Sequence, residues 1–366
     1  REVPRGLLLS PAPGTGAPRR VFLHIGLPKT GTTYLQQVVW ANRDRLRSHG
    51  LLLPGFGHRE HLWAALDLQE RPRLERRHKD APGAWQRLVD EATAHPGDVL
   101  ITHEFLCGAS AEQASRALSS FPGAEVHLVV TARDAASVVS AGWQESVKNG
   151  STVDLDAVMD GRPAGGPEFS MRTWDLAGVL ERWTPDLPGE RVHVLVMPGR
   201  DAAPDLHWRH LAEVLGLDPD AYDVPTESVN PALGIVQIET LRLVNQHLPK
   251  YNAHDRGVWI RGYLAEDLLA RQPRERGGLP ERYRSRFAEL DRAATEMVTT
   301  RGFHVLGDLA ALDGERREEA ARGAGREPGT VTAEELLESA ARLVADIVAD
   351  VRASTGDVPP RSRGII

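Results

Sequence analysis

The chain has 366 residues, of which 41% are hydrophobic and 26% charged, and these values allow a globular protein with a sizeable core. Lys plus Arg number 44 and Asp plus Glu 51, so the net charge of −7 argues against a general nucleic-acid-binding protein. The single cysteine, Cys107, can form no intrachain disulfide, and no apolar run approaches the roughly 18 residues of a membrane span. We therefore expect a cytoplasmic protein with neither a nucleic-acid nor a membrane partner. Cys107 is expected to be a small buried residue rather than a nucleophile.

Short apolar runs predict the strands, and helical spacing of apolar residues predicts the segments between them. The expected strands are 20–26, 51–53, 98–102, 125–131 and 191–197. The expected helices are 32–49, 60–70, 83–94, 111–120 and 134–149, followed by 205–215, 232–247, 257–271 and 282–300. This alternation predicts an α/β fold with a parallel sheet of about four to five strands, helices on both faces, and a helical C-terminal part.

The turns that follow the strands are where function is expected. Right-handed crossovers place the strand-to-helix turns of a parallel sheet at one edge. The segments 26–33, 102–108 and 131–137 should therefore converge there, although they are far apart in the sequence.

Composition also predicts the boundaries of the parts. The expected parts are a flexible arm at 1–19, one domain at 20–310, a charged linker at 311–331, an amphipathic helix at 332–354 and a tail at 355–366. The amphipathic helix can dock on the domain or pair with a second chain in a homodimer, and docking is the simpler alternative.

The segment 26–33 has the properties of a phosphate-binding loop. It follows the first strand and opens the first helix, so the free N–H groups and positive dipole end of that helix face an anion. Gly31 allows close approach of the backbone. The polar side chains of the loop belong to Lys29, Thr30, Thr32 and Thr33. Hydroxyl and ammonium donors of this kind bind anionic oxygens.

The loop departs from that of the P-loop nucleotide triphosphatases. Gly26 and Gly31 have the expected G-x-x-x-x-G spacing, but Thr32 stands where the lysine should follow. The lysine of this loop is Lys29, which precedes the second glycine. A P-loop kinase that uses Mg-ATP is therefore poorly supported.

The run Pro28-Lys29-Thr30-Gly31-Thr32-Thr33-Tyr34 resembles the 5′-phosphosulfate loop of sulfotransferases, which use 3′-phosphoadenosine 5′-phosphosulfate (PAPS). The resemblance covers about residues 20–250 and extends to the soluble, actinobacterial sulfotransferase-like proteins through Trp143-Gln144 and, more weakly, the run 228–234. It implies a P-loop-like sulfotransferase fold, with the residues from Pro28 to Thr33 around the phosphosulfate. It also implies that Tyr34 lies near the adenine.

Sulfotransferases carry a second anion signature, in which an Arg ends a buried strand and a Ser follows in the next helix. Arg133 matches the Arg of this signature and would bind the 3′-phosphate of PAPS. The family Ser lies eight residues later, where this chain has Ala141. Ser140 is the preferred replacement, and Ser137 is the alternative.

Transfer of the sulfuryl group also needs a base for the proton of the acceptor. The resemblance to cytosolic sulfotransferases, which place a catalytic His at a strand end, favours His103, and its neighbour Glu104 is an alternative. Glu60 and His61 lie near the place where other sulfotransferases have a catalytic Glu. Lys29 would stabilise the charge on the leaving phosphate, so no metal ion is expected. The spacing of His58, Glu60 and His61 supports a metal site only weakly.

The sequence thus predicts transfer of a sulfuryl group from PAPS to a hydroxyl or amine of a small molecule or saccharide. Adenosine 3′,5′-bisphosphate would be released. A non-catalytic nucleotide-binding module of the same fold remains an alternative, because Ala141 departs from the family pattern.

Overall fold

The computed structural model describes residues 18–166, 168–199, 201–224, 233–313 and 325–355. The chain divides into two compact units. The first comprises Arg1–Val138, Arg172–Glu227 and Glu289–Gly314, and the second comprises Val139–Met171, Ser228–Ala288 and Glu315–Ile366. Residues 20–310, expected to form one domain, are distributed over both units, and the expected domain boundaries stay predictions.

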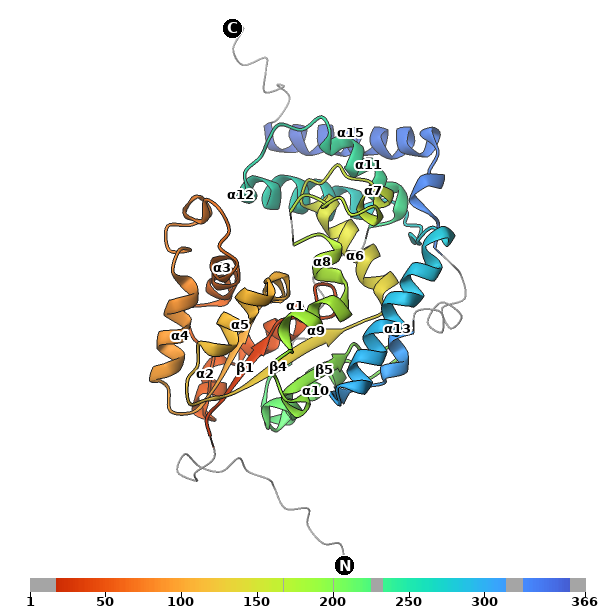
Figure 1. Ribbon diagram of the computed structural model, residues 1–366. Helices are drawn as coiled ribbons and strands as arrows, with labels where there is room; N and C mark the ends of the chain where they lie inside the picture. Colours follow the sequence, from red (N-terminus) through yellow and green to blue (C-terminus); the bar gives the residue numbers. More distant parts are fainter. Residues whose placement is uncertain (1–17, 167, 200, 225–232, 314–324, 356–366) are drawn as a thin grey trace, which may run out of the picture. The chain divides into compact units, whose positions relative to one another are not determined.

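The described part of the first unit holds a parallel sheet of six strands in the order β2-β3-β1-β4-β5-β6. The strands are β1 (Arg20–His24), β2 (Leu51–Leu52), β3 (Asp98–Thr102), β4 (Glu125–Ala132), β5 (Val192–Val196) and β6 (His304–Leu306). Figure 1 shows β1, β4 and β5 side by side. The predicted α/β fold with a parallel sheet is confirmed. The structure adds β6, which is too short to be recognised from an apolar run.

Helices cover both faces of this sheet. The α-helices that contribute residues to the first unit are α1 (Thr32–Ala41), α2 (Arg43–Ser48), α3 (His58–Leu68), α4 (Ala84–Ala94), α5 (Ala111–Ser119), α6 (Ala135–Lys148), α8 (Met171–Trp174), α9 (Leu176–Trp183), α10 (Leu206–Leu215) and α13 (Arg284–Thr300). Short 3-10 turns lie at Leu74–Arg76, Glu104–Gly108, Gly189–Arg191, Pro219–Ala221, Leu269–Arg271, Glu281–Tyr283, Leu309–Leu312 and Pro328–Thr330. The division between the two units falls within α6, α8 and α13, each of which contributes residues to both.

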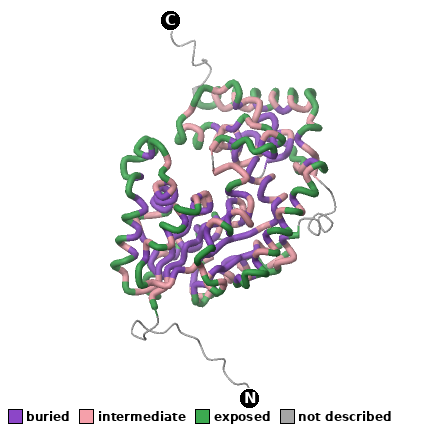
Figure 2. The backbone as a smooth tube through the Cα atoms, viewed as in Figure 1, coloured by how far each residue is buried: buried purple, intermediate pink, exposed green. Residues whose placement is uncertain are grey.

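Alternate residues of each strand point to opposite faces, which produces two apolar layers. On one face Leu23 and Leu128 pack with residues of α3, α4, α5 and α9. On the other face Phe22 and Val129 pack with residues of α1, α2 and α10. The strands from β1 to β5 are accordingly buried along most of their length, whereas in the short β6 only Leu306 is buried (Figure 2). This packing fixes the strand order and therefore the positions of the loops at the strand ends.

One helix expected at 32–49 is instead two helices, because Asn42 interrupts it. The side-chain amide of Asn42 donates to the carbonyls of Val38 and Asp223, at 2.9 and 2.8 Å. Its side-chain oxygen accepts the N–H of Asp223 at 3.0 Å. These long-range bonds compete with continuation of the helix. Helical periodicity cannot reveal them, since Asp223 is remote in the sequence.

The second unit is helical where it is described. It contains the later part of α6, α7 (Leu155–Met159), α11 (Ile235–Asn245), α12 (Ala253–Asp255), the π-helix η5 (Arg256–Leu268) and α15 (Ala333–Thr355). The amphipathic C-terminal helix docks within this unit, where α15 contacts α11 and η5. Leu343 of α15 is buried, and the hydroxyl of Ser339 donates to Gln272 at 2.8 Å. None of the described helices combines the length and the apolar character needed to cross a membrane.

Candidate anion-binding site

The loops that follow β1, β3 and β4 meet at the carboxyl edge of the sheet, as expected. The N–H of Leu27 donates to the carbonyl of Thr131 at 2.8 Å, and the N–H of Thr131 donates to Gly26 at 3.1 Å. On the other side of β1, the N–H of His103 donates to the carbonyl of His24 at 3.1 Å. Neighbours of β1 on both sides thus contribute to one site. In open α/β sheets, such a switch between neighbouring strands is where ligands bind.

The N-terminus of α1 opens at this site without a capping side chain. Gly31 is its N-cap residue, no side chain accepts from the helix, and the first turn carries no acidic residue. The first hydrogen bond of the helix runs from Leu35 N–H to the Gly31 carbonyl at 3.2 Å. The helices α7 and α9 are capped by the carboxylates of Asp154 and Asp175, whereas α3, α4, α10 and α11 lack a side-chain cap, as α1 does. The positive end of α1 is therefore left for an external anion.

The backbone of the loop is bent by three residues with positive φ. These are Gly26 at 77°, Lys29 at 65° and Gly31 at 85°. A positive φ is unfavourable for a residue with a Cβ, so Lys29 is held there by its surroundings. Its side chain is half-buried, while Pro28 and Thr32 are buried and Thr33 is exposed. Three positive φ values within six residues give the loop a sharply bent backbone.

Thr30 differs from the other loop threonines because its hydroxyl faces the sheet. Thr30 is fully buried, and its hydroxyl donates to the carbonyl of Leu27 at 2.5 Å. The same oxygen lies 2.6 Å from the hydroxyl oxygen of Thr131 on β4. The side chain therefore ties the loop to the sheet, and Thr30 would meet an anion through its backbone.

Tyr34 lies at the start of α1 and packs against the apolar layer that contains Phe22 and Trp208. Burial, and then the carboxylate of Asp205, raise the pKa of Tyr34. Its hydroxyl has no hydrogen-bond partner among the described residues. The expected position of Tyr34 beside an adenine stays a prediction.

Two histidines of the site were not recognised from the sequence. His24, the last residue of β1, lies with its Nδ1 2.7 Å from the hydroxyl of Thr102, and His207 of α10 lies with its Nε2 3.0 Å from the carbonyl oxygen of Thr30. Burial is the main reason that the pKa of each falls to about 4, so both imidazoles are neutral. In the sequence, only the position of His24 just before the phosphate loop indicates that it belongs to the site. No feature of the sequence indicates this for His207.

Glu104 lies against the start of the loop, in a polar cluster with α1 and α3. The side-chain amide of Gln36 donates to the Glu104 carboxylate at 2.8 Å, and the amide oxygen of Gln36 lies 2.9 Å from Nε2 of His58. Burial pushes the pKa of Glu104 upward, but the nearby His103 and the bond from Gln36 outweigh it, so the pKa lies below its usual value. Glu104 is therefore an ionised carboxylate with a fixed orientation.

His103 is buried beside Glu104 and caps the short turn that follows β3. Its Nδ1 accepts the N–H of Phe105 at 3.1 Å. Burial lowers the pKa of His103, and the charge of Glu104 offsets this in part. A neutral imidazole that accepts at Nδ1 carries its proton on Nε2. In this tautomer His103 has an N–H to donate and no second lone pair to accept a proton.

Glu60 and His61 are held by structural contacts around the loop that precedes α3. The Glu60 carboxylate accepts the N–H of Phe56 at 2.9 Å and the Nε–H of Arg87 at 3.1 Å. His61 places Nε2 2.8 Å from the carbonyl of Pro54, and its Nδ1 accepts the N–H of Thr102 at 3.0 Å.

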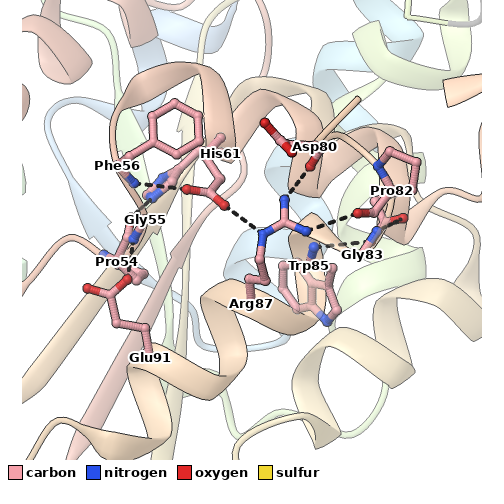
Figure 3. Close-up of polar contacts among 12 residues, drawn as sticks. Pro54, Gly55, Phe56, His61, Asp80, Pro82, Gly83, Trp85, Arg87 and Glu91 are labelled. Carbon is pink, nitrogen blue, oxygen red and sulfur yellow. Dashed lines mark hydrogen bonds and ion pairs between the residues drawn. The ribbon is translucent and has the colours of Figure 1, made fainter. Parts of the chain in front are cut away.

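Figure 3 shows Arg87 at the centre of this network, where it also reaches the carbonyls of Asp80 and Pro82. Burial is the main cause that lowers the pKa of His61 to about 4. Both ring nitrogens of His61 and both carboxylate oxygens of Glu60 are thus engaged, which supports a structural role for the pair.

Arg133 follows β4 at the same edge of the sheet. Its side chain is 27% exposed, and its Nε lies 3.8 Å from the carboxylate of Asp134. The N-terminus of α6 is already capped, because Asp134 accepts the N–H of Ser137 at 2.8 Å and Asp291 accepts the N–H of Ala135 at 2.7 Å. A phosphate at this place would therefore be bound by side chains rather than by the helix end.

The serine expected beside Arg133 lies on α6, which passes from one unit to the other. Ser137 and Arg133 belong to the first unit, whereas Ser140 and Ala141 belong to the second. Ser137 and Ser140 are both half-buried. The choice between the two serines stays a prediction. Of the loop 228–234, residues 228–232 lie outside the described residues.

Two further chemistries find little support. Cys107 is fully buried, and burial raises the pKa of its thiol, so no thiolate nucleophile is presented. Within the described ranges, no group of three or more His, Cys, Asp or Glu side chains is arranged to hold a metal ion.

Comparisons with known proteins add one likeness. No model of a protein family and no curated protein matches the chain. Among solved structures, it is similar to the crystal structure of a sulfotransferase from Alicyclobacillus acidocaldarius, with 17% identity and a TM-score of 0.40. The match covers 63% of this chain and 93% of that chain. A likeness of this size carries no argument about activity or substrate.

Proposed function

We propose that the protein is a PAPS-dependent sulfotransferase. It would transfer the sulfuryl group of PAPS to a hydroxyl or amine of a small molecule or saccharide. The observation that carries the proposal is the uncapped N-terminus of α1, with Lys29 in a bent loop before it and Arg133 after the adjacent strand. Two cationic side chains at neighbouring strand ends suit a ligand with phosphates at both the 5′ and the 3′ position.

In this proposal the loop holds the phosphosulfate through backbone N–H groups and the hydroxyls of Thr32 and Thr33. The acceptor oxygen or nitrogen forms a bond to sulfur, and the bond between sulfur and the 5′-phosphate oxygen breaks. The electron pair of that bond remains on the phosphate, where Lys29 stabilises the charge. Adenosine 3′,5′-bisphosphate leaves, and the acceptor proton passes to a base.

We propose Glu104 as that base. Its carboxylate is ionised and is oriented by Gln36, and its Cα and Cβ pack on Gly26 at the start of the loop. His103 is less suited, because its Nδ1 already accepts from Phe105 and its Nε2 then carries the proton. His103 would instead donate a hydrogen bond within the site. The acceptor is left open, since acceptor pockets are not determined by the fold.

Calorimetric titration with adenosine 3′,5′-bisphosphate and with Mg-ATP distinguishes a PAPS-dependent sulfotransferase from a P-loop kinase. We expect tight binding of the bisphosphate and much weaker binding of Mg-ATP. Equal, weak binding of both would overturn the PAPS assignment, and preferred binding of Mg-ATP would support a P-loop kinase.

A transfer assay separates the enzyme from a non-catalytic nucleotide-binding module. PAPS labelled in its sulfate is incubated with mixed hydroxyl and amine acceptors, and labelled product is measured. Tight binding of the bisphosphate without transfer to any acceptor would favour the binding module.

A further inference from the structure

His207 of α10 makes two contacts with the phosphate loop. Its Nε2 lies 3.0 Å from the carbonyl oxygen of Thr30. A Cβ added to Gly31 would lie 2.9 Å from Cδ2 of the same ring. The imidazole therefore lies against two consecutive residues of the loop, Thr30 and Gly31.

The hydrogen bond fixes the tautomer of His207. A carbonyl oxygen can only accept, so Nε2 carries the proton and donates it to Thr30. Nδ1 is then a lone-pair acceptor, and it has no hydrogen-bond partner among the described residues. His207 is only 6% exposed, so solvent does not compete for the donated bond.

The same bond determines where the next N–H points. The carbonyl of Thr30 and the N–H of Gly31 belong to one peptide unit, and the structure contains no cis peptide bond in its described part. In a trans unit these two groups point in opposite directions. Because the carbonyl is directed at His207, the N–H of Gly31, the N-cap residue of α1, is directed away from His207.

We infer that His207 is a positioning residue of the 5′-phosphate site, which holds the Thr30–Gly31 peptide so that the Gly31 N–H faces the anion. The inference rests on the proposed function, because that function supplies the nucleotide. The contact with the ring also explains why residue 31 is glycine, since any Cβ would collide with the imidazole at a φ of 85°.

Variants at position 207 test the inference. His207→Met keeps a side chain of similar volume and removes the donor. His207→Gln keeps an N–H at the reach of Nε2, and His207→Asn keeps an amide that is too short to reach Thr30. His210→Met, one turn later on α10, is the matched control.

Binding is measured by calorimetry with adenosine 5′-phosphate, adenosine 3′-phosphate and the 3′,5′-bisphosphate. We expect His207→Met and His207→Asn to bind both 5′-phosphorylated ligands roughly three- to tenfold more weakly, the range that one hydrogen bond supports. Binding of the 3′-phosphate should be unchanged, and His207→Gln should recover most of the loss. His210→Met should behave as the unaltered protein.

Equal weakening of the 5′- and 3′-phosphates would assign His207 a purely structural role and overturn the inference. Unchanged binding in both His207→Met and His207→Asn would overturn it as well. These results differ from a failure of the proposed function, in which the unaltered protein itself would bind no nucleotide. That result would remove the basis of both.

Discussion

Gly26 and Glu104 are in direct contact at the carboxyl edge of the sheet. A Cβ added to Gly26 would lie 2.6 Å from the Cβ of Glu104. The loop after β1 therefore packs on the residue that follows β3. Because β1 and β3 are adjacent strands, this contact places Glu104 beside the loop that is proposed to hold the phosphosulfate.

Lys29→Ala should abolish sulfuryl transfer while the fold persists. Lys29 is proposed to stabilise charge on the leaving phosphate, and loss of such an electrostatic contact lowers kcat by at least about 100-fold. Transfer of labelled sulfate measures the effect. Lys79→Ala, which alters an exposed lysine of the same unit, is the control. Normal turnover in Lys29→Ala would refute the role of the loop.

Glu104→Gln should lower kcat by about 100-fold or more and leave binding of the bisphosphate nearly unchanged. The substitution retains the shape of the side chain and the bond from Gln36, but removes the capacity to accept a proton. His103→Gln should have a smaller effect on kcat, because the proposed base is untouched. The opposite ranking of the two variants would make His103 the base.

The bent loop between β1 and α1 could be predicted from the sequence because its determinants are local. Gly26, Lys29 and Gly31 lie within six consecutive residues, and the apolar run before them predicts the strand that precedes the loop. The same holds for Arg133, which directly follows a strong apolar run. The convergence of the loops follows from handedness alone.

The remainder of the site depends on contacts that no local pattern contains. His207 reaches Thr30 from a helix far along the chain, and the tautomer of His103 is set by how the chain turns after β3. Both ring nitrogens of His61 are engaged by a strand end and a loop that flank it in space. The identity of a histidine says nothing about such partners, which is why the candidates for the base could not be ranked by their chemistry from sequence.

Arg133→Ala should weaken binding of adenosine 3′,5′-bisphosphate by about 1–3 kcal/mol, the cost of removing a charged hydrogen-bond donor. Binding of adenosine 5′-phosphate should be unchanged, because that ligand lacks the 3′-phosphate. Arg191→Ala, at the opposite end of the strands, is the control. Equal losses for both nucleotides would show that Arg133 is not the 3′-phosphate residue.

Glu60→Gln should destabilise the protein without lowering kcat of the folded enzyme. The Glu60 carboxylate is 6% exposed and pairs with Arg87, which is 43% exposed, so loss of the charged bond should cost about 1–3 kcal/mol. Chemical unfolding measures the stability, and Arg87→Met should reproduce the loss. A large drop in kcat at unchanged stability would instead assign Glu60 to the chemistry.

Stability should fall as the pH is lowered, in part through a row of histidines on β4, β5 and β6. Nδ1 of His127 lies 2.9 Å from Nε2 of His193, whose Nδ1 lies 3.0 Å from Nδ1 of His304. Nε2 of His127 lies 2.9 Å from the carboxylate of Glu125. Burial, then His127, His304 and Arg20, lower the pKa of His193 to about 3.

The direction of the pH effect follows from this pKa. The unfolded chain takes up a proton at His193 near pH 6.5, whereas the folded protein does not until about pH 3. Between these values the unfolded state binds more protons, so the free energy of unfolding decreases as the pH falls, by about 1.4 kcal/mol per pH unit for each such proton. Urea unfolding at pH 7.5, 6 and 5 measures the slope. His193→Leu should reduce this slope below pH 6.5 by the equivalent of about one proton. His49→Leu, which alters an exposed histidine, is the control. An unchanged slope in His193→Leu would show that His193 is charged in the folded protein.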